Sequence, residues 1–556
     1  MKITKYALML CFVVWASFPV CKAQGSDPNE IEKLKAKLAE QQKQIDTLVQ
    51  ALKDQEATLD GMSRSSAAPA AQAAAPQVGA LMASSTPMLA PAPASAPASP
   101  KLSPPAPAPQ AAAADQPSPL QLKLGNISIT PVGFLDATGV WRSKAAGSGI
   151  GSNFGSIPFD NAVPGGHLNE FRFSPQNSRV GFRVDGNWKG TQFLNYLEMD
   201  FLGTGAANNI GITNGAFVPR LRLWWLSMRK GGWEVLGGQS WSMFTANRKG
   251  ISALPGDIFY GQEFDVNYLI GMPWTRQPGF RALYHGTGDK VTLGLSAENP
   301  NQYMGGYGGG GQIVLPSALG AVGGTQLDNG SASFLSTPNV APDLIAKLAF
   351  DPTSRVHFEV GGIARFFKIY NTSTGQPNSG RTSSTSGGGG EANGIFEVVK
   401  GLRLISNNQY GDGIGRYFFG NAPDLVVRAD GSLSPIHTLT TVDGFEATVK
   451  NSLLYFYFGG IYIGKNVAVD NNGSLIGWGY TGSSNGQNRS VNEYTFGINQ
   501  TLWKSPAYGA VNMMLQYEYA TRTPWYVATG ALDHASDHTV YFDLRYTLPG
   551  AAPAIK

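Results

Sequence analysis

The stretch that decides the fold is residues 179–185, Arg179-Val180-Gly181-Phe182-Arg183-Val184-Asp185, where apolar residues alternate with charged residues or glycine. A period of two residues predicts a β-strand with one apolar and one polar face. The same pattern recurs at 220–225, 355–360 and 539–546. In a soluble β-protein the apolar face would form the core. In a membrane barrel it would face lipid, and the charged face would line the lumen.

Connections of two alternating lengths separate the predicted strands. Short polar turns occur at 186–190, 230–232, 286–290, 351–354, 399–401, 450–451 and 504–508. Long connections rich in Gly, Asn and Ser occur at 141–170, 203–218, 245–276, 299–341, 371–390, 411–441, 464–488 and 521–536. Seven short turns alternating with eight long loops predict an all-β transmembrane barrel of 16 antiparallel strands over residues 120–550. An even strand number places both ends of the barrel on the same, periplasmic, side.

The composition favours a membrane barrel over a soluble multidomain protein. Charged residues make up 14% of the chain, well below the roughly 25% of soluble domains, whereas the hydrophobic fraction of 42% is ordinary. Beyond the first 20 residues, no segment approaches the ~18 consecutive apolar residues of a membrane-spanning helix. The formal net charge of +4 is too small to indicate nucleic-acid binding.

Residues 1–23 have the three parts of a signal peptide. Lys2 and Lys5 supply the charged part, Tyr6–Val20 the apolar part, and Cys21-Lys22-Ala23 a cleavage site. A lipoprotein signal is the alternative, although Phe18-Pro19-Val20 is a poor approach to a lipidated cysteine. Both cysteines of the chain fall in this segment, so the exported chain would contain no disulfide.

Residues 24–64 are predicted to form an α-helical coiled coil, an oligomerising stalk in the periplasm. Asp27, Pro28 and Glu30 make a favourable helix start. Core positions then recur at alternating spacings of three and four: Ile31, Leu34, Leu38, Gln41, Ile45, Leu48, Leu52, Gln55, Leu59 and Met62. The glutamines occupy d positions, where polar residues restrict register and oligomer state. The stripe is too narrow for a helix on a globular surface; we prefer a trimer, and the pattern leaves a dimer open.

A low-complexity segment, residues 65–119, separates the stalk from the barrel. It consists mainly of Ala, Pro, Ser and Gln, as at 90–94. Such a segment cannot bury enough apolar surface to fold, and its prolines hold it extended at about 3.1 Å per residue. We therefore predict a disordered linker here and a short tail at 551–556 after the barrel.

The polar faces of the strands predict the lining of the lumen. Inward-facing basic residues are Arg172, Arg179, Arg183, Arg220, Arg222, Arg281, Arg365, Arg403 and Arg545. Inward-facing acids are Asp185, Glu198, Asp200, Glu359, Glu446, Glu493, Glu518 and Asp543. Most of the arginines lie in the first third of the barrel and several acids in the last third, which favours a transverse field and a preference for anions. The alternative is that arginines and acids on neighbouring strands pair and stiffen the wall.

The connection at 245–276 is a candidate constriction. A loop at this place that folds into the barrel would narrow the lumen with the charged residues Arg248, Lys249, Asp257, Glu263, Asp265 and Arg276. An extracellular loop without contact to the pore is the alternative. The strand at 453–463 is apolar on both faces, so its inner face packs on such a loop or its outer face joins a subunit contact.

The sequence patterns that could indicate catalysis or metal binding lack the structural context that such sites require. The segment 482–486 matches the G-x-S-x-G pattern but has no strand–turn–helix context. His534 and His538 have metal-ligand spacing, yet they sit in a polar loop that is more typical of solvent exposure. We expect neither an enzyme nor a cofactor or resident metal.

The segments 178–182, 238–242 and 276–281 resemble the DcaP-like outer-membrane porins, as does the order of signal, coiled coil, spacer and barrel along the whole chain. The short motifs are only moderately specific, since other porins share pieces of them. The resemblance implies a trimer of 16-stranded barrels with a periplasmic coiled coil, taking up small anions such as dicarboxylates. It also implies a basic lumen at Arg179, Arg276 and Arg281. The C-terminus departs from the usual pattern of such barrels, which commonly end on an aromatic residue, because this chain runs past Tyr546 to a short tail.

We therefore expect a porin in the outer membrane of a Gram-negative-type bacterium, giving passive diffusion of small anionic solutes. Expected partners are two further copies of the chain, outer-membrane lipid and lipopolysaccharide, and peptidoglycan through the stalk, with no nucleic acid. The first alternative is a general or sugar-type porin, supported by Trp224, Tyr196 and Tyr541, which are predicted to face inward. A structural envelope tether is the second, and an outer-membrane hydrolase lacks the residues it needs.

Overall fold

The computed structural model describes residues 118–203, 217–307, 310–319, 326–328, 340–371 and 380–550, together with Lys43 and Gln50. By its contacts the chain divides into two units, 1–103 and 104–556. In the first unit only Lys43 and Gln50 are described, and both are helical. The predicted signal peptide, all core residues of the predicted stalk, nearly all of the linker, and the C-terminal tail thus lie outside the described residues.

The second unit is built from β-strands. Its wall strands are β2 (Ile127–Arg142), β5 (Glu170–Ser174), β6 (Arg179–Trp188), β7 (Thr191–Gly203), β8 (Val218–Lys230), β9 (Trp233–Trp241), β10 (Arg276–His285), β11 (Val291–Glu298), β12 (Asp343–Thr353), β13 (Val356–Asn371), β14 (Arg381–Val399), β15 (Leu402–Asp412), β18 (His437–Val449), β19 (Ser452–Ile463), β22 (Asn488–Ser505), β23 (Gly509–Pro524) and β24 (Ala535–Thr547). Shorter strands are β1 (Leu122–Leu124), β3 (Gly147–Ser148), β4 (Gly151–Ser152), β16 (Leu425–Val427), β17 (Leu433–Pro435), β20 (Asn466–Val469) and β21 (Leu475–Trp478). Single 3-10 turns are η2 (Phe154–Ser156), η3 (Gly165–His167), η4 (Pro255–Asp257), η5 (Thr287–Asp289) and η7 (Gly415–Tyr417).

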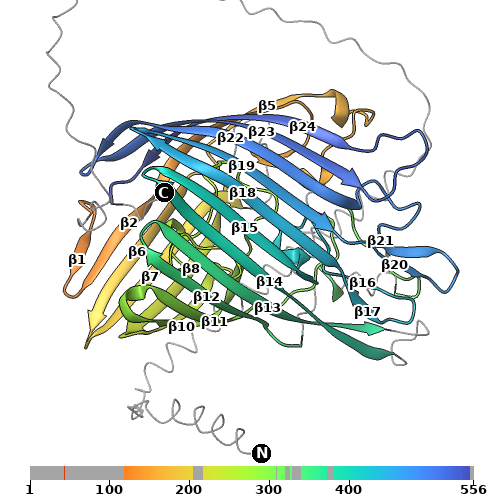
Figure 1. Ribbon diagram of the computed structural model, residues 1–556, viewed down its shortest axis with the longest axis horizontal. Helices are drawn as coiled ribbons and strands as arrows, with labels where there is room; N and C mark the ends of the chain where they lie inside the picture. The colour runs from red at the N-terminus through yellow and green to blue at the C-terminus, as the bar shows by residue number, and fades with distance from the viewer. Residues whose placement is uncertain are drawn as a thin grey trace, which may run out of the picture. The chain divides into compact units, whose positions relative to one another are not determined.

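The wall closes on itself as an antiparallel barrel (Figure 1). β5 and β6 pair with successive parts of β2, so they are two halves of one wall strand interrupted at 175–178. The last strand, β24, pairs with β2 along residues 134–142 and completes the barrel. The predicted number of 16 antiparallel strands is confirmed. No helix among the described residues is long and apolar enough to cross a membrane.

All seven predicted short turns join the strands that the pattern assigned to them. Two predicted long loops were too long. Residues 381–390 belong to β14, where they pair with β13 from Asn371 to Gly362, and β18 begins already at His437. The first error has a clear cause: a run of Ser, Thr and Gly has no apolar face, but its backbone still hydrogen-bonds to a neighbouring strand.

The two faces of the wall differ sharply in exposure. Outward residues are apolar and open, such as Phe280 at 74% and Phe173 at 70% exposed. Inward residues are mostly polar and buried, and Glu493 and Arg365 are both 0% exposed. An apolar outer surface around a polar interior is the pattern of outer-membrane barrels. The inner face is buried because several long connections fold into the barrel and fill much of it.

One strand breaks the alternation on which its side-chain directions were predicted. In the pairing of β7 with β8, Glu198 lies opposite Leu223 and Met199 opposite Leu221, which marks a β-bulge. A bulge adds one residue to a strand and reverses the faces beyond it. Trp224, predicted to point inward, is therefore 57% exposed on the outer face, whereas Trp225 points inward and is 2% exposed. The prediction for Trp224 was wrong.

The doubly apolar strand β19 has its inner face against an inward-folded loop. Tyr457 is buried, and its hydroxyl accepts a hydrogen bond of 3.0 Å from the backbone N–H of Gln262. At Gly459, an added Cβ would meet the carbonyl oxygen of Ile270. Of the two alternatives for this strand, the structure therefore shows the inner contact with the loop.

Candidate functional site: the loop inside the barrel

The connection between β9 and β10, residues 242–275, runs through the interior of the barrel and touches most of its wall. Five of its backbone N–H groups donate to buried side chains of five different strands. The pairs are Met243 to Glu298 (2.7 Å), Asn247 to Glu359 (3.1 Å), Gln262 to Tyr457 (3.0 Å), Phe264 to Gln516 (3.2 Å) and Ile270 to Glu493 (3.0 Å). A buried loop must satisfy its backbone polar groups, and here the inner wall supplies the acceptors.

Arg248, a predicted constriction residue, is held on the wall by an acid of β18. Its guanidinium donates to both carboxylate oxygens of Glu446, at 3.1 and 2.7 Å, and to the carbonyl oxygen of Tyr260. Burial alone would lower the pKa of Arg248, but the Glu446 carboxylate outweighs it and holds this pKa above its ordinary value. This bidentate pair fixes the first part of the loop.

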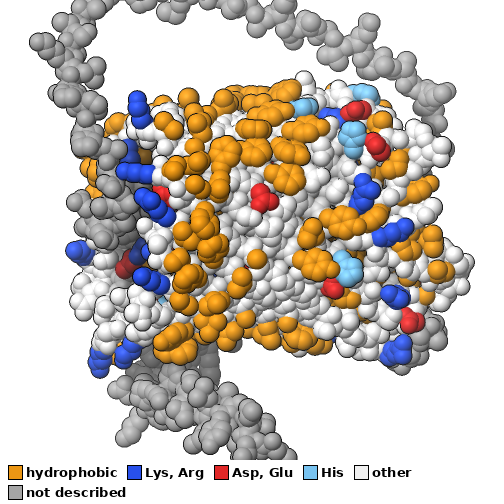
Figure 2. Space-filling view, in the orientation of Figure 1, with side chains coloured by type: hydrophobic (Ala, Val, Ile, Leu, Met, Phe, Trp, Pro, Cys, Tyr) orange, Lys and Arg blue, Asp and Glu red, His pale blue; other side chains and the backbone are white. Residues whose placement is uncertain are grey.

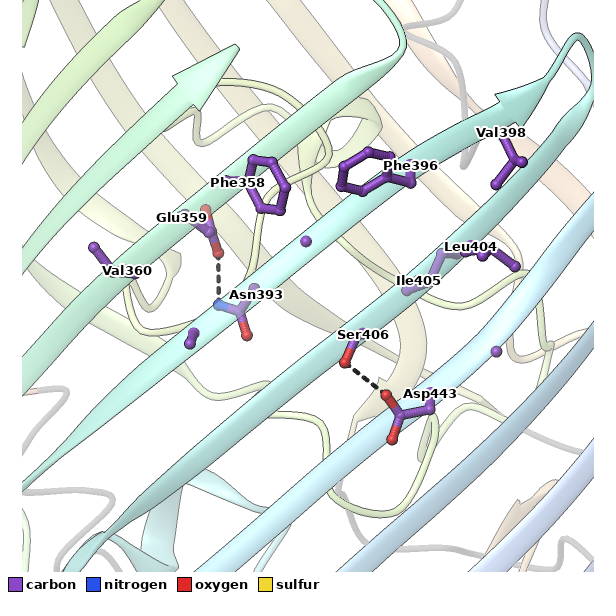
Figure 3. Close-up of a pocket in the computed structure, with 13 residues that line it drawn as sticks. Phe358, Glu359, Val360, Asn393, Phe396, Val398, Leu404, Ile405, Ser406 and Asp443 are labelled. Carbon is purple, nitrogen blue, oxygen red and sulfur yellow. Dashed lines mark hydrogen bonds between the residues drawn. The ribbon is translucent and has the colours of Figure 1, made fainter. Parts of the chain in front are cut away.

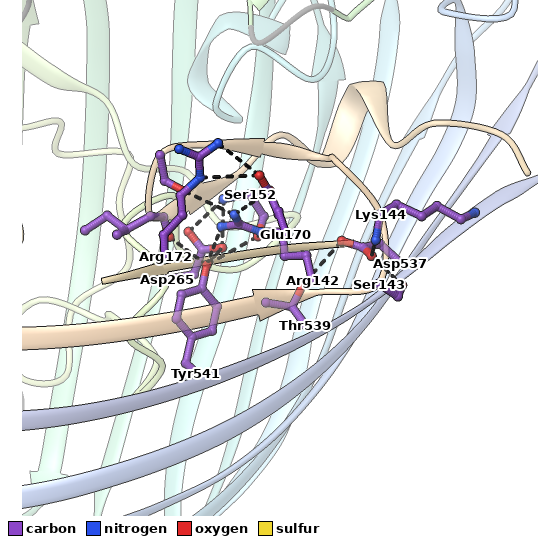
Figure 4. Close-up of polar contacts among 12 residues, drawn as sticks. Arg142, Ser143, Lys144, Ser152, Glu170, Arg172, Asp265, Asp537, Thr539 and Tyr541 are labelled. Atoms are coloured by element: carbon purple, nitrogen blue, oxygen red, sulfur yellow. Dashed lines mark hydrogen bonds and ion pairs between the residues drawn. The ribbon is translucent and has the colours of Figure 1, made fainter. Parts of the chain in front are cut away.

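Asp265, another predicted constriction residue, joins the loop to β24 and to the connection after β2 (Figure 4). It accepts hydrogen bonds from the backbone N–H of Ser152 at 3.0 Å and from the hydroxyl of Tyr541 at 2.7 Å. Arg142 donates to the same hydroxyl at 3.1 Å and pairs with Glu170 at 2.9 Å. Burial raises the pKa of Asp265, and the nearby guanidinium offsets part of that effect.

The arginines of β6 and β8 form a compact group with two acids of β7. Arg222 pairs with Glu198 at 2.8 Å and with Asp200 at 2.6 Å. Arg220 pairs with Asp200 at 2.7 Å, and Arg179 lies 3.7 Å from Glu198. Neighbouring strands thus place several predicted lumen residues together, and their charges are largely paired.

A tyrosine of the loop completes this group. The hydroxyl of Tyr268 accepts hydrogen bonds from Arg179 at 3.1 Å and from Arg222 at 3.0 Å. Burial raises the pKa of Tyr268, but the two guanidinium groups outweigh it, so the pKa lies below the usual tyrosine value. Tyr268 therefore anchors the far part of the loop to the basic side of the wall.

Arg276, at the start of β10, differs from its basic neighbours. Its Nη1 is buried and has no hydrogen-bond partner among the described residues. The guanidinium lies over the ring of Trp241 at 5.4 Å, and Arg222 lies over the same ring at 5.6 Å. The preceding residues Trp274 and Thr275 also carry a buried side-chain donor without a partner. Trp274, Thr275 and Arg276 thus each have a buried donor without a partner among the described residues. They lie close to the ring of Trp241, over which the guanidinium groups of Arg276 and Arg222 lie.

Aromatic rings of the loop, of β9 and of the connection after β15 lie around Arg276. Trp241 contacts Tyr260 at 4.9 Å and Tyr268 at 5.9 Å, between ring centroids. Trp274 stacks on Phe419 at 4.4 Å. These rings are not among the residues predicted above to line the lumen. The signal was present, however, because 258–274 is too apolar and aromatic for a loop in water.

Other predicted lining residues lie on the inner face at separate places. Arg281 contacts the carbonyl oxygen of Trp241 and lies 3.8 Å from Glu298. Arg365 is fully buried between Asp343 (3.1 Å) and Asp424 (2.7 Å), and Arg545 pairs with Asp136 at 2.9 Å. The pairs Arg172–Glu170 (3.0 Å) and Arg183–Asp185 (2.7 Å) are more open to solvent.

Three predicted residues remain apart from these groups. Arg403 is half-buried on β15, opposite Glu446 in the register of β18. Lys249 is exposed, and Asp257 accepts a hydrogen bond of 3.0 Å from Ser252 within the loop. Across the described ranges, no cluster of three His, Cys, Asp or Glu side chains could hold a metal ion.

Glu263 gives a prediction about pH. Both of its carboxylate oxygens are buried without a partner from another described residue, and burial together with Glu493 and Asp265 raises its pKa, although Arg248 acts in the opposite direction. A raised carboxyl pKa favours the seated loop in acid and costs stability as the pH rises above the ordinary value of about 4.3. We expect single-channel currents to flicker more at about pH 8 than at about pH 5, because the loop is less firmly seated.

The matched variant is Glu263→Gln, which cannot ionise. Its flickering should be similar at both pH values, because the charge that penalises the seated loop is gone. Asp257→Gln, altered in a more open part of the same loop, should keep the pH dependence of the unsubstituted protein. An unchanged pH dependence in Glu263→Gln would contradict this explanation.

Several solved structures of outer-membrane proteins resemble this chain in fold. The chain superposes on the outer membrane channel DcaP of Acinetobacter baumannii with a TM-score of 0.54 and 15% identity, covering 77% of this chain and 99% of that one. It also matches an anion-selective porin from Comamonas acidovorans (TM-score 0.41, 12% identity, 76% of this chain and 100% of that one). A third match is OmpF of Salmonella typhi in complex with daunomycin (TM-score 0.42, 9% identity, 77% and 100%). No protein-family model and no curated protein matches the sequence.

Proposed function

The chain has a DcaP-like porin fold, as its sequence resemblance predicted, and from that premise we propose that it lets small hydrophilic anions diffuse passively across the outer membrane. The observation that carries the proposal is Arg276, whose guanidinium is held against Trp241 with one buried N–H end unpaired. The surrounding group contains the four arginines 179, 220, 222 and 276 but only the two acids Glu198 and Asp200. An anion that meets this group would satisfy donors that the protein leaves free.

Dicarboxylates are the solute class that this arrangement suits. A planar guanidinium presents two parallel donors to a carboxylate, so one unpaired arginine binds one carboxylate end. Arg220, whose side chain is 35% exposed, offers a donor for a second end. The flat rings of Trp274 and Phe419 would border the carbon chain between the two ends.

The assembly that we propose is a homotrimer in the outer membrane of a Gram-negative-type bacterium. The heptad pattern of 24–64 supports it, as a predicted coiled coil that joins copies on the periplasmic side. Contacts with outer-membrane lipid and lipopolysaccharide follow from the apolar outer wall. Contact of the stalk with peptidoglycan is part of the same proposal.

The test is the reversal potential of the purified full-length protein in a planar bilayer under a potassium chloride gradient. We expect a potential of the sign that chloride preference gives, and a reduction of the chloride current by added succinate. Cation preference would overturn the proposal. Arabinose, a neutral solute of similar size, serves as the control and should leave the current nearly unchanged.

A sugar-type porin is the second candidate, and the observation that favours it is the aromatic group of Trp241, Trp274 and Phe419. Sugar rings stack on such surfaces through their apolar faces. Block of the current by maltose at concentrations where succinate has no effect would favour this candidate. Trp224 no longer supports it, because the ring lies on the outer face.

A further inference from the structure

The short-turn end of the barrel carries a ring of basic side chains. Each of the seven short turns has an exposed Lys or Arg within it or directly beside it. We call this set the basic rim, and its members are Lys189, Lys230, Lys290, Arg355, Lys400, Lys450 and Lys504. Because the turns follow one another around the barrel, the positive charges surround the whole short-turn end.

Acids of the same end have partners outside the rim. Asp289 pairs with Arg229 at 2.6 Å, and Asp351 pairs with His357 at 2.9 Å. The Glu397 carboxylate accepts a hydrogen bond of 2.8 Å from a backbone N–H of its own turn. Figure 2 shows mainly basic side chains along the short-turn end, at the left, and a mixture of basic and acidic ones at the long-loop end, at the right. The rim is therefore a surface of one sign.

The basic rim lies directly beside aromatic rings of the outer wall. Trp188 and Trp503, each one residue before a rim lysine, are 63% and 45% exposed, and Trp233 on the next strand is 63% exposed. The Lys189 ammonium lies over the ring of Trp188, 4.9 Å from its centroid. Aromatic belts lie at the level of the lipid headgroups, and a strand rises only ~3.3 Å per residue. The rim cations therefore lie at headgroup level, with their stems along the wall.

The middle of the outer wall differs from the rim. Farther from the short turns, a hollow of about 640 Å³ opens on this wall between the rings of Phe358 and Phe396. Its lining contains the acid Asp443, which accepts a hydrogen bond of 2.6 Å from Ser406 (Figure 3). No Lys or Arg is among the residues that line it. The hollow thus offers no positive charge to an anionic headgroup, in contrast to the rim.

Two of the rim lysines occupy a backbone conformation that other residue types adopt more easily. Trp188 pairs with Thr191, so Lys189 and Gly190 form a two-residue hairpin loop, with φ of +50° and +77°. Lys450 likewise has φ of +54°. Such left-handed positions favour Gly, Asn or Asp, and a lysine there is strained. This local cost at two turns indicates that the charge serves a purpose beyond the turn.

We propose that the basic rim binds anionic phospholipids, such as phosphatidylglycerol, in the inner leaflet of the outer membrane. The lipid phosphate accepts hydrogen bonds from the rim ammonium and guanidinium groups, while the acyl chains run along the apolar wall. Short turns of such barrels face the periplasm, where this leaflet lies, and a polybasic surface at headgroup level attracts anionic lipid. The inference concerns the lipid around the barrel and holds whichever solute the lumen conducts.

The test measures the lipid preference of the full-length protein in bilayers of phosphatidylglycerol and phosphatidylcholine in equal parts. Quenching of its tryptophan fluorescence by a brominated form of one lipid or the other gives the ratio of the two affinities. We expect a preference of about fourfold for phosphatidylglycerol at about 0.05 M potassium chloride and almost none at about 0.5 M, because salt screens exposed charges. A ratio near one at low salt would overturn the proposal, as would a preference that salt leaves unchanged.

Two matched variants locate the effect. The rim variant carries four substitutions: Lys189→Gln, Lys230→Gln, Lys450→Gln and Lys504→Gln. The loop-end variant carries four substitutions of exposed basic residues away from the short turns: Arg381→Gln, Arg428→Gln, Lys465→Gln and Arg489→Gln. We expect the preference to fall to near one in the rim variant and to persist in the loop-end variant, with heat-modifiable mobility showing that both barrels are folded. Equal losses in both variants would contradict a site at the rim.

Two further measurements distinguish the lipid from other anions. Glycerol 3-phosphate, a soluble phosphate of the same chemistry, should leave the lipid preference unchanged at millimolar concentration. If it abolished the preference, a soluble anion would be the occupant and the proposal would be wrong. The rim variant should also sediment with purified peptidoglycan as well as the unsubstituted protein does. Loss of that sedimentation together with an unchanged lipid preference would assign the rim to the cell wall instead.

Discussion

Replacement of Arg276 by Gln is expected to remove most of the anion preference that we propose for this barrel. A unit charge about 4 Å from a passing ion contributes ~1 kcal/mol in bulk water and more in a partly dry lumen. The other arginines of the group pair with Glu198 or Asp200, so Arg276 supplies much of the uncompensated charge. We expect the chloride-to-potassium permeability ratio, measured from reversal potentials, to fall about tenfold.

The control for this experiment is Arg183→Gln. Arg183 also faces the lumen, but it pairs with Asp185 at 2.7 Å near the short-turn end of the barrel. Its removal should change the permeability ratio much less than the loss of Arg276. Equal effects of the two substitutions would show that selectivity depends on the overall charge of the lumen and not on the unpaired group.

Replacement of Arg222 by Met is expected to have the largest effect on the structure of the pore. Arg222 donates to Glu198, Asp200 and Tyr268, and its side chain is 4% exposed. Removal of one partner from a buried ion pair leaves uncompensated charge and costs roughly 3–5 kcal/mol. The loop also loses one of the two guanidinium donors that hold Tyr268. We therefore expect a larger, noisier conductance and unfolding at a lower temperature.

Two measurements separate these effects. Single-channel recording reports release of the loop, and the temperature at which the folded band disappears on gels reports the stability of the wall. Tyr268→Phe should reproduce the noisy conductance with little change in unfolding temperature, because the wall ion pairs remain. A quiet, unchanged conductance in both variants would contradict the anchoring of the loop by Tyr268.

Much of the barrel is predictable from the sequence because a membrane wall imposes a strict chemical alternation. Residues 179–185 show it most clearly, since each outward position must be apolar and each inward one can be polar. The prediction fails where the alternation itself is altered. The bulge at Arg222–Leu223 turned Trp224 outward, and no pattern of residue types marks such a bulge.

The interior of the barrel is less predictable, because it depends on contacts between distant parts of the chain. The charges of Arg248 and Asp265 are visible in the sequence, but not that Arg248 pairs with Glu446 or that Asp265 joins Tyr541. The inward direction of Arg179 and Arg222 follows from periodicity. Their burial behind Tyr268 does not, because it depends on the course of a loop without a repeating pattern.

The loop is attached to the wall mainly through its backbone. Attachment to the wall is thereby separated from the second task proposed for this segment, the lining of the solute path. Met243, Asn247, Phe264 and Ile270 hold the wall with backbone N–H groups, which every residue type except proline provides. Side chains of the loop that border the proposed solute path can therefore be exchanged while these attachments persist. Point substitutions in the loop could therefore change which solutes a related barrel admits, while the barrel and the seating of its loop stay the same.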